Sequence, residues 1–249
     1  MTAYEERTYR VACRGQGLVP FTVRVKETDL WIQALGDYSQ PALDSILRHR
    51  RGLEAYIEEH PRFLSSLTPL PQDPLAPPLV KAMLAAGLAA GTGPMAAVAG
   101  AVAQFVAQDL LELSPQVVVE NGGDIYLALE RETTVGLLAG KSPLSGKLGI
   151  KVPAQAMPLA VCTSSGTVGP SLSLGRADAA TILAKDAALA DAAASALGNR
   201  VRNRGDLAGA VEWVAQWIPG IVGALAVLDD RLAAWGEISL VELGGGPKP

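Results

Sequence analysis

One uncharged stretch, residues 82–108, restricts what this chain can fold into. The stretch is long enough to cross a bilayer as a helix. It consists mainly of alanine and glycine, however, and contains few Leu, Ile or Phe residues, so its insertion into lipid would be unfavourable. Residues 91–94 (GTGP) also interrupt it. We therefore expect two buried helices, over residues 79–90 and 95–112, in a protein without a membrane span.

The composition excludes several classes of protein. Apolar residues make up 49% of the 249 residues and charged residues 18%, which excludes a disordered chain. The two cysteines, Cys13 and Cys162, lie far apart, which excludes a disulfide framework and a zinc ribbon. The two histidines, His49 and His60, lie in one charged segment, so we expect no His-centred metal site and no catalytic triad.

The charge and the N-terminal sequence indicate the partners and the location. The 21 Lys and Arg residues against 25 Asp and Glu residues give a net charge of −4, so we expect no nucleic-acid partner. Residues 1–7 contain no apolar segment typical of a signal peptide, and we expect a cytoplasmic protein. The modest charge, the Ala/Gly-rich segments and the exposed edge strand of a C-terminal hairpin favour a homodimer.

Helical and strand periodicities alternate irregularly along the chain, which predicts an α+β fold in one globular unit over residues 1–249. A proline-rich connector is expected at about 68–78 and a frayed tail at 244–249. The predicted helices cover residues 41–60, 79–90, 95–112, 187–197 and 206–217, with Asp186 as an N-cap and Gly198 as a stop. The predicted strands are a hairpin within 7–25 that turns at 15–17, then 30–34, 117–121, 124–127, 133–139, 147–152, 158–163, 178–184, 221–228 and 232–243.

Residues 91–96 (GTGPMA) match the pattern G-x-G-x-x-A at the start of a helix. Backbone N–H groups at such a helix start can hold a phosphate. A Rossmann fingerprint must follow a strand, whereas this one follows a helical pattern, so we expect no Rossmann domain. Gly93 and its neighbours form either a ligand-binding loop or a simple turn between two buried helices.

The run Asn121, Gly122, Gly123 and Asp124 separates two β-prone segments, so a hairpin turn is the simplest interpretation. Paired glycines also allow a ligand to approach the backbone closely, and Asp124 would then face it.

A run of hydroxyl residues follows the apolar strand that ends at Cys162. Its hydroxyl and N–H groups form a dense set of donors for phosphate or ribose oxygens, or a Ser/Thr-rich turn. Cys162 itself is a candidate nucleophile or a buried structural thiol. The run consists of Thr163, Ser164, Ser165, Gly166 and Thr167.

Asp191 is the only charged residue between Ala187 and Asn199 in a helix that is apolar on all sides. A buried carboxylate needs a partner, and Ser195 lies one turn further along the same face. Carboxylate and hydroxyl oxygens are ligands that Mg²⁺ accepts beside water and phosphate, so Asp191 and Ser195 are candidate metal ligands. The alternative is an Asp191 that accepts a hydrogen bond from neighbouring backbone.

The order of these motifs resembles the ApbE superfamily, whose characterised members are FAD-binding, Mg²⁺-dependent flavin transferases. The chain is most similar to a shorter, uncharacterised ApbE-like family, over roughly residues 90–200. The matching segments are residues 93–100 (GPMAAVAG), 120–124 (ENGGD), 162–169 (CTSSGTVG) and 187–199. Two features of the transferases are missing: residues 170–178 replace a His-x-Ile-x-Asp-Pro-x-Thr-Gly segment, and Ala99 stands where a Lys precedes the glycine.

The resemblance implies an ApbE-like α+β fold with mixed or antiparallel sheets packed against Ala-rich helices. It also implies a site for a phosphate-bearing ligand, FAD or FMN, with Mg²⁺ at Asp191 and Ser195, and group transfer or hydrolysis as the chemistry. The shorter family's association with homocysteine biosynthesis implies an alternative, in which Cys162 carries sulfur as a persulfide. A second alternative is a non-catalytic binding or assembly module. Asp191 and Cys162 are accordingly the candidate catalytic residues.

Overall fold

Eight antiparallel strands form the central layer of the computed structural model, which describes residues 17–166 and 175–243. The strand order is β1-β2-β3-β4-β7-β8-β9-β10, and a smaller antiparallel sheet has the order β11-β6-β5. The large sheet contains β1 (Val19–Val25), β2 (Thr28–Ala34), β3 (Val117–Asn121), β4 (Asp124–Ala128), β7 (Leu159–Ser164), β8 (Ala179–Ala184), β9 (Ile221–Leu228) and β10 (Arg231–Gly236). The small sheet contains β5 (Thr133–Gly136), β6 (Leu148–Val152) and β11 (Ser239–Glu242).

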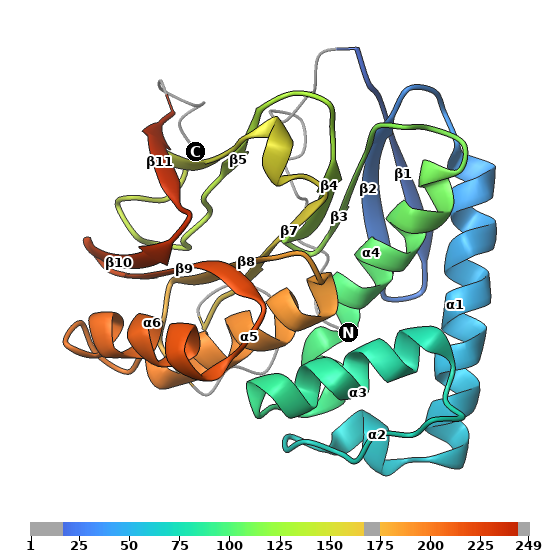
Figure 1. The fold of residues 1–249 in the computed structure, drawn as a ribbon, viewed down its shortest axis with the longest axis horizontal. Helices are drawn as coiled ribbons and strands as arrows, with labels where there is room; N and C mark the ends of the chain where they lie inside the picture. The colour runs from blue at the N-terminus through green and yellow to red at the C-terminus, as the bar shows by residue number, and fades with distance from the viewer. Residues whose placement is uncertain (1–16, 167–174, 244–249) are drawn as a thin grey trace.

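Helices cover one face of the large sheet, and the small sheet covers the other. Figure 1 shows α5 and α6 on one side of β8 and β9, with β5 and β11 on the opposite side. The helices are α1 (Ser39–Glu59), α2 (Arg62–Ser65), α3 (Pro78–Ala90), α4 (Val98–Leu111), α5 (Ala187–Arg200) and α6 (Asp206–Trp217), with 3₁₀ turns η2 (Pro94–Ala97) and η3 (Ala154–Ala156). The antiparallel α+β architecture predicted from the sequence is confirmed.

Side-chain alternation along the strands produces this three-layer arrangement. In β7, Ala160 and Cys162 belong to the core under the helices, whereas Leu159 and Val161 belong to the core under the small sheet. Because successive residues of a strand point to opposite faces, a strand buried on both sides reads as a continuous apolar run.

The uncharged stretch forms α3 and α4, as predicted. The segment Pro94–Leu111 is long and apolar enough to cross a membrane by composition, but half of it is buried inside the protein. Helix α4 packs on α5 with backbones in close approach, because a Cβ added to Gly100 would lie 2.3 Å from the Ala187 carbonyl oxygen. The small residues therefore serve helix packing, and the expectation of two buried helices is confirmed.

The structure corrects several predicted elements. Helix α5 continues to Arg200 instead of ending before Gly198, where an added Cβ would lie 3.8 Å from the Ser164 hydroxyl. The predicted strand 232–243 is divided between β10 and β11, which belong to different sheets, because Gly236 has a φ of +79°. Strand β5 ends at Gly136, and the short helix α2 was not predicted.

Residues between α2 and α3 form an irregular connection that is fixed to its surroundings. The Tyr56 hydroxyl donates a hydrogen bond to Asp73 Oδ2 at 3.0 Å. Other predicted segments lie outside the described residues, namely the strand around Tyr9 and Val11 and the tail 244–249.

Candidate functional site

The end of β7 and the beginnings of β4 and β8 lie side by side at one end of the central strands of the large sheet. Strand β7 runs antiparallel to β4 and β8, so the end of β7 lies beside the beginnings of both neighbours. Asp124, the first residue of β4, is buried, and its Oδ1 accepts a hydrogen bond from the Thr163 amide at 3.2 Å. Tyr126 belongs to the core under the helices, and residues two apart in a strand share a face. Asp124 therefore lies at this end of the strands on the face covered by the helices.

Asp191 reaches the same region from α5. Its Oδ2 accepts a hydrogen bond from the Gly100 amide at 2.9 Å, in the first turn of α4. A carboxylate at this position satisfies an amide that has no partner within the helix and interacts favourably with the helix dipole. The Asn121 side chain completes this arrangement by donating to the Ala99 carbonyl at 3.1 Å. The alternative expected for Asp191, a hydrogen bond accepted from the backbone, is thus present.

The two carboxyl groups influence each other's ionisation. Desolvation, and then the negative charge of Asp191, raises the pKa of Asp124 well above its ordinary value. Desolvation raises the pKa of Asp191 to about 7, although hydrogen bonds from the amides of Gly100 and Ala99 oppose the shift. Burying both charges together is therefore unfavourable without a compensating cation.

Cys162 lies on the helix side of β7, close to these carboxyl groups. Its side chain is fully buried, and the thiol donates to the Ala187 carbonyl at 3.6 Å. Desolvation, and then the negative charges of Asp124 and Asp191, raises the pKa of the thiol well above its ordinary value. A thiol in this environment stays protonated at neutral pH and is a poor nucleophile.

The predicted turn at Gly122 and Gly123 is present, and both glycines have positive φ angles of 68° and 103°. The Glu120 side chain closes the turn by accepting from the Gly123 amide at 2.8 Å. Glu120 is not among the residues predicted from the sequence, although a carboxylate directly before an NGG run is a signal that identifies it.

The hydroxyl residues after Cys162 do not share one surface. Thr163 lies on the small-sheet side, where its hydroxyl is 2.9 Å from that of Thr181. Ser164 lies on the helix side, near Gly198 of α5. Alternation along β7 thus separates side chains that are adjacent in sequence. Ser165 and Gly166 follow the strand, and Thr167 lies outside the described residues.

Gly93 serves packing between two backbone segments. A Cβ at this position would lie 1.8 Å from the Ser66 carbonyl oxygen, so only glycine allows the two backbones to approach this closely.

Ser195 is half-buried one turn after Asp191. Its hydroxyl forms no hydrogen bond to any residue that the structure describes. Among those residues, no group of three or more His, Cys, Asp and Glu side chains is arranged to hold a metal ion. The oxygen ligands predicted for a metal therefore remain the carboxylate of Asp191 and the hydroxyl of Ser195, with the carboxylate of Asp124 close to Asp191.

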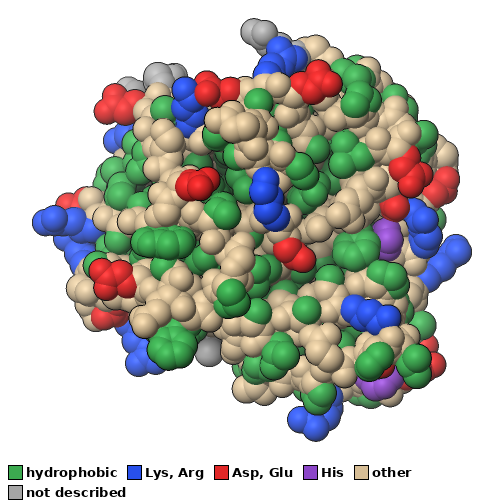
Figure 2. Space-filling model, in the orientation of Figure 1, with side chains coloured by type: hydrophobic (Ala, Val, Ile, Leu, Met, Phe, Trp, Pro, Cys, Tyr) green, Lys and Arg blue, Asp and Glu red, His purple; other side chains and the backbone are tan. Residues whose placement is uncertain are grey.

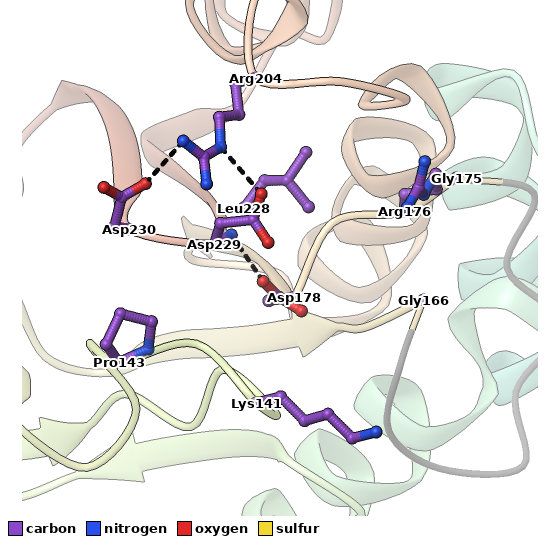
Figure 3. A pocket seen from close by; sticks show the side chains of 10 residues that line it. All are labelled: Lys141, Pro143, Gly166, Gly175, Arg176, Asp178, Arg204, Leu228, Asp229 and Asp230. Carbon is purple, nitrogen blue, oxygen red and sulfur yellow. Dashed lines mark hydrogen bonds and ion pairs between the residues drawn. The ribbon is translucent and has the colours of Figure 1, made fainter.

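A cavity of about 480 Å³ opens beyond the C-terminal end of α5 (Figure 3). Its rim includes Gly166, Lys141 and Arg176, but neither Asp124 nor Asp191. Arg204 crosses one wall and pairs with Asp229 at 2.8 Å and Asp230 at 3.1 Å, as the dashed lines in Figure 3 show. The structure thus places Gly166 at a mixed-charge cavity that is distinct from the carboxylate pair.

The surface carries both signs of charge. Figure 2 shows basic and acidic side chains interspersed on one face, without a block of a single sign.

The architecture is that of the ApbE flavin transferases. The flavin transferase ApbE from Vibrio cholerae superposes with a TM-score of 0.51 at 13% identity, covering 88% of this chain and 96% of that protein. The apo form of the flavinyl transferase ApbE from Pseudomonas stutzeri gives a TM-score of 0.52 at 12% identity, covering 88% and 94%. At this level of identity the similarity establishes the fold alone.

The sequence comparisons identify the family. A family model described as "AbpE bacteria" matches residues 10–211, and the chain belongs to this family. A UPF0280 protein from Methanocella arvoryzae is 41% identical over 216 residues, which cover 86% of this chain and 87% of the relative. A UPF0280 protein from Methanosarcina barkeri is 38% identical over 220 residues, which cover 88% and 87%. The resemblance to a short ApbE-like family is confirmed.

Proposed function

We propose that the protein binds a flavin nucleotide together with a divalent cation beside the carboxyl groups of Asp124 and Asp191. The observation that carries the proposal is the pairing of these two groups, from β4 and α5, in a chain with the ApbE fold. Bringing two carboxyl groups together in a desolvated site is costly, and a bound cation offsets that cost.

The donor set fits Mg²⁺ better than a softer metal. Asp124, Asp191 and Ser195 supply only oxygen atoms, the ligand type that Mg²⁺ prefers. Mg²⁺ is commonly held by one or two carboxylates, with water and substrate phosphate completing its coordination. Two carboxylates without a closed cage therefore support a shared metal–nucleotide site rather than a structural metal.

Each residue has a separate task in this proposal. Asp191 stays oriented by the Gly100 amide and carries the negative charge that attracts the cation. Asp124 stays oriented by the Thr163 amide, and the exposed Gly122 leaves room for a ligand beside the turn. A cation bound here would polarise a phosphoryl oxygen, which supports group transfer or hydrolysis.

The sulfur-transfer alternative receives no support from Cys162. A persulfide carrier needs an accessible thiolate, whereas this thiol is fully buried and has a raised pKa.

A thermal-shift screen with FAD, FMN, ADP and AMP, each with and without Mg²⁺, tests the proposal. We expect FAD or FMN to raise Tm only when Mg²⁺ is present, because the carboxyl groups repel the phosphates otherwise. A ligand at 100 times its Kd stabilises the folded state by about 2.7 kcal/mol. For a chain of this size, each kcal/mol of stabilisation raises Tm by about 2–4 °C.

The matched variants are Asp191→Asn and Glu58→Gln. Each removes one negative charge, but Glu58 is exposed on α1 and is not among the groups that shift the pKa of Asp124 or Asp191. The Mg²⁺-dependent shift should vanish in Asp191→Asn and persist in Glu58→Gln. Equal shifts in both variants, or no shift in the parent with any of the four nucleotides, would contradict the proposal.

A further inference from the structure

The large sheet ends in two open strands that differ in how they are protected. Within the described residues, β1 pairs only with β2, and β10 pairs only with β9 (Figure 1). An open strand presents unpaired N–H and C=O groups to any chain that approaches it. Prolines and charged side chains on an edge strand prevent such pairing.

Strand β1 carries a proline and a charge within its length, whereas the only charged residue of β10 is Arg231 at its start. Pro20 and Arg24 are exposed on β1, where proline removes a donor and arginine adds charge. From residue 232 to 236, β10 has neither proline nor charge, and Leu232 and Trp235 remain 38% and 40% exposed. Trp217, at the end of the adjacent helix α6, is 61% exposed. Leu232, Trp235 and Trp217 therefore add exposed apolar surface to the β10 edge.

We propose that β10 pairs antiparallel with β10 of a second copy of this chain, so that two large sheets join into one. The occupant of the edge is a second copy because the strand is complementary to itself. A twofold axis at Ala234 places the small side chain of Ala233 opposite the large Trp235 of the second copy. The same register places Leu232 opposite Gly236, where no side chain competes for space.

Charge complementarity supports the same pairing. Arg231 begins β10 and Glu237 follows its last residue. Neither has an ion pair within the part of the chain that the structure describes. In an antiparallel pair, the start of one strand lies beside the end of the other, so Arg231 of each copy lies beside Glu237 of its mate. Both ends of the interface then join opposite charges.

The solution mass measured by light scattering at micromolar concentrations tests this interface. The parent should have twice the monomer mass of 25.8 kDa. Ala234→Lys should dissociate it, because two ammonium groups would meet at the axis, raising the dimer Kd by at least about tenfold. Ala234 is exposed, so the variant keeps its core, which circular dichroism checks.

A matched control and a charge exchange make the test specific. Thr22→Lys adds the same charge to an exposed position of β1, at the other edge, and should leave the mass unchanged. Arg231→Glu and Glu237→Arg should each weaken the dimer, and the double variant should restore it. A monomeric parent, a dimer that survives Ala234→Lys, or dissociation by Thr22→Lys instead would overturn the proposal.

Discussion

Replacing Asp191 with asparagine should stabilise the metal-free protein at alkaline pH. The pKa of Asp191 is about 7 in the folded state, against an ordinary value of 3.8, so the folded protein holds this proton more tightly than the unfolded chain. The stabilisation from the protonated group is complete below the unfolded value and is lost as pH rises through about 7. The difference corresponds to a ceiling of about 4 kcal/mol, at about 1.36 kcal/mol per pKa unit.

Asparagine keeps an oxygen that accepts from the Gly100 amide but cannot ionise. In EDTA, the stability advantage of Asp191→Asn over the parent should therefore be roughly 1–2 kcal/mol at pH 5 and roughly 4 kcal/mol at pH 8. Chemical denaturation at both pH values measures this difference. Asp191→Ala should be about 1–3 kcal/mol less stable than Asp191→Asn, because the amide loses its acceptor.

Mg²⁺ should reverse this ranking at pH 8. The cation binds the ionised carboxylate, so its stabilising effect on the parent should grow as pH rises through about 7 and be absent in Asp191→Asn. An asparagine variant that is less stable than the parent at pH 8 in EDTA would refute the reasoning. It would mean that the α4 amides stabilise the charged carboxylate more than burial destabilises it.

Three further predictions concern packing and reactivity. Iodoacetamide should not label Cys162 in the native protein at pH 8, because the thiol is buried and has a raised pKa, and native labelling detected by mass spectrometry would contradict this burial. In the same way, Cys162→Ser should change the free energy of nucleotide binding by less than about 1 kcal/mol. Gly100→Ala should lower the free energy of unfolding by about 1–3 kcal/mol in urea titrations, because its Cβ would overlap the Ala187 carbonyl. Unchanged stability would contradict the close approach of α4 and α5. Asp109→Asn should cost roughly 0.5–1 kcal/mol in the same assay, because Asp109 Oδ2 lies 2.6 Å from Arg48 on α1 and 2.9 Å from His49. No loss would mean that these contacts contribute little.

Local patterns determined most of the secondary structure. The two alanine-rich helices, the NGG hairpin and the N-cap at Asp186 depend on residues close together in the sequence, and all were predicted. The errors arose where distant contacts decide the conformation. Gly198 remains helical in a position packed against β7 and β8, and Gly236 divides a strand because its conformation redirects the chain.

The site was predictable in its residue types but not in its partners. A lone carboxylate in an apolar helix indicated that Asp191 needs a partner, yet the Gly100 amide lies 91 positions away. The pairing of Asp191 with Asp124 likewise depends on how α5 crosses the sheet. The sequence predicts one surface for the hydroxyl run, because its alternation becomes visible only when β7 is known to extend to Ser164.

Strand β7 imposes a strict limit on changes in chain length. It places Cys162 toward the helices and Thr163 toward the small sheet, and it pairs on both sides with β4 and β8. Inserting or deleting one residue before Cys162 would exchange the two faces, moving the thiol into the other layer and a hydroxyl toward the buried carboxyl groups. Length variation among functional versions of this chain must therefore fall in the connections, never within this strand.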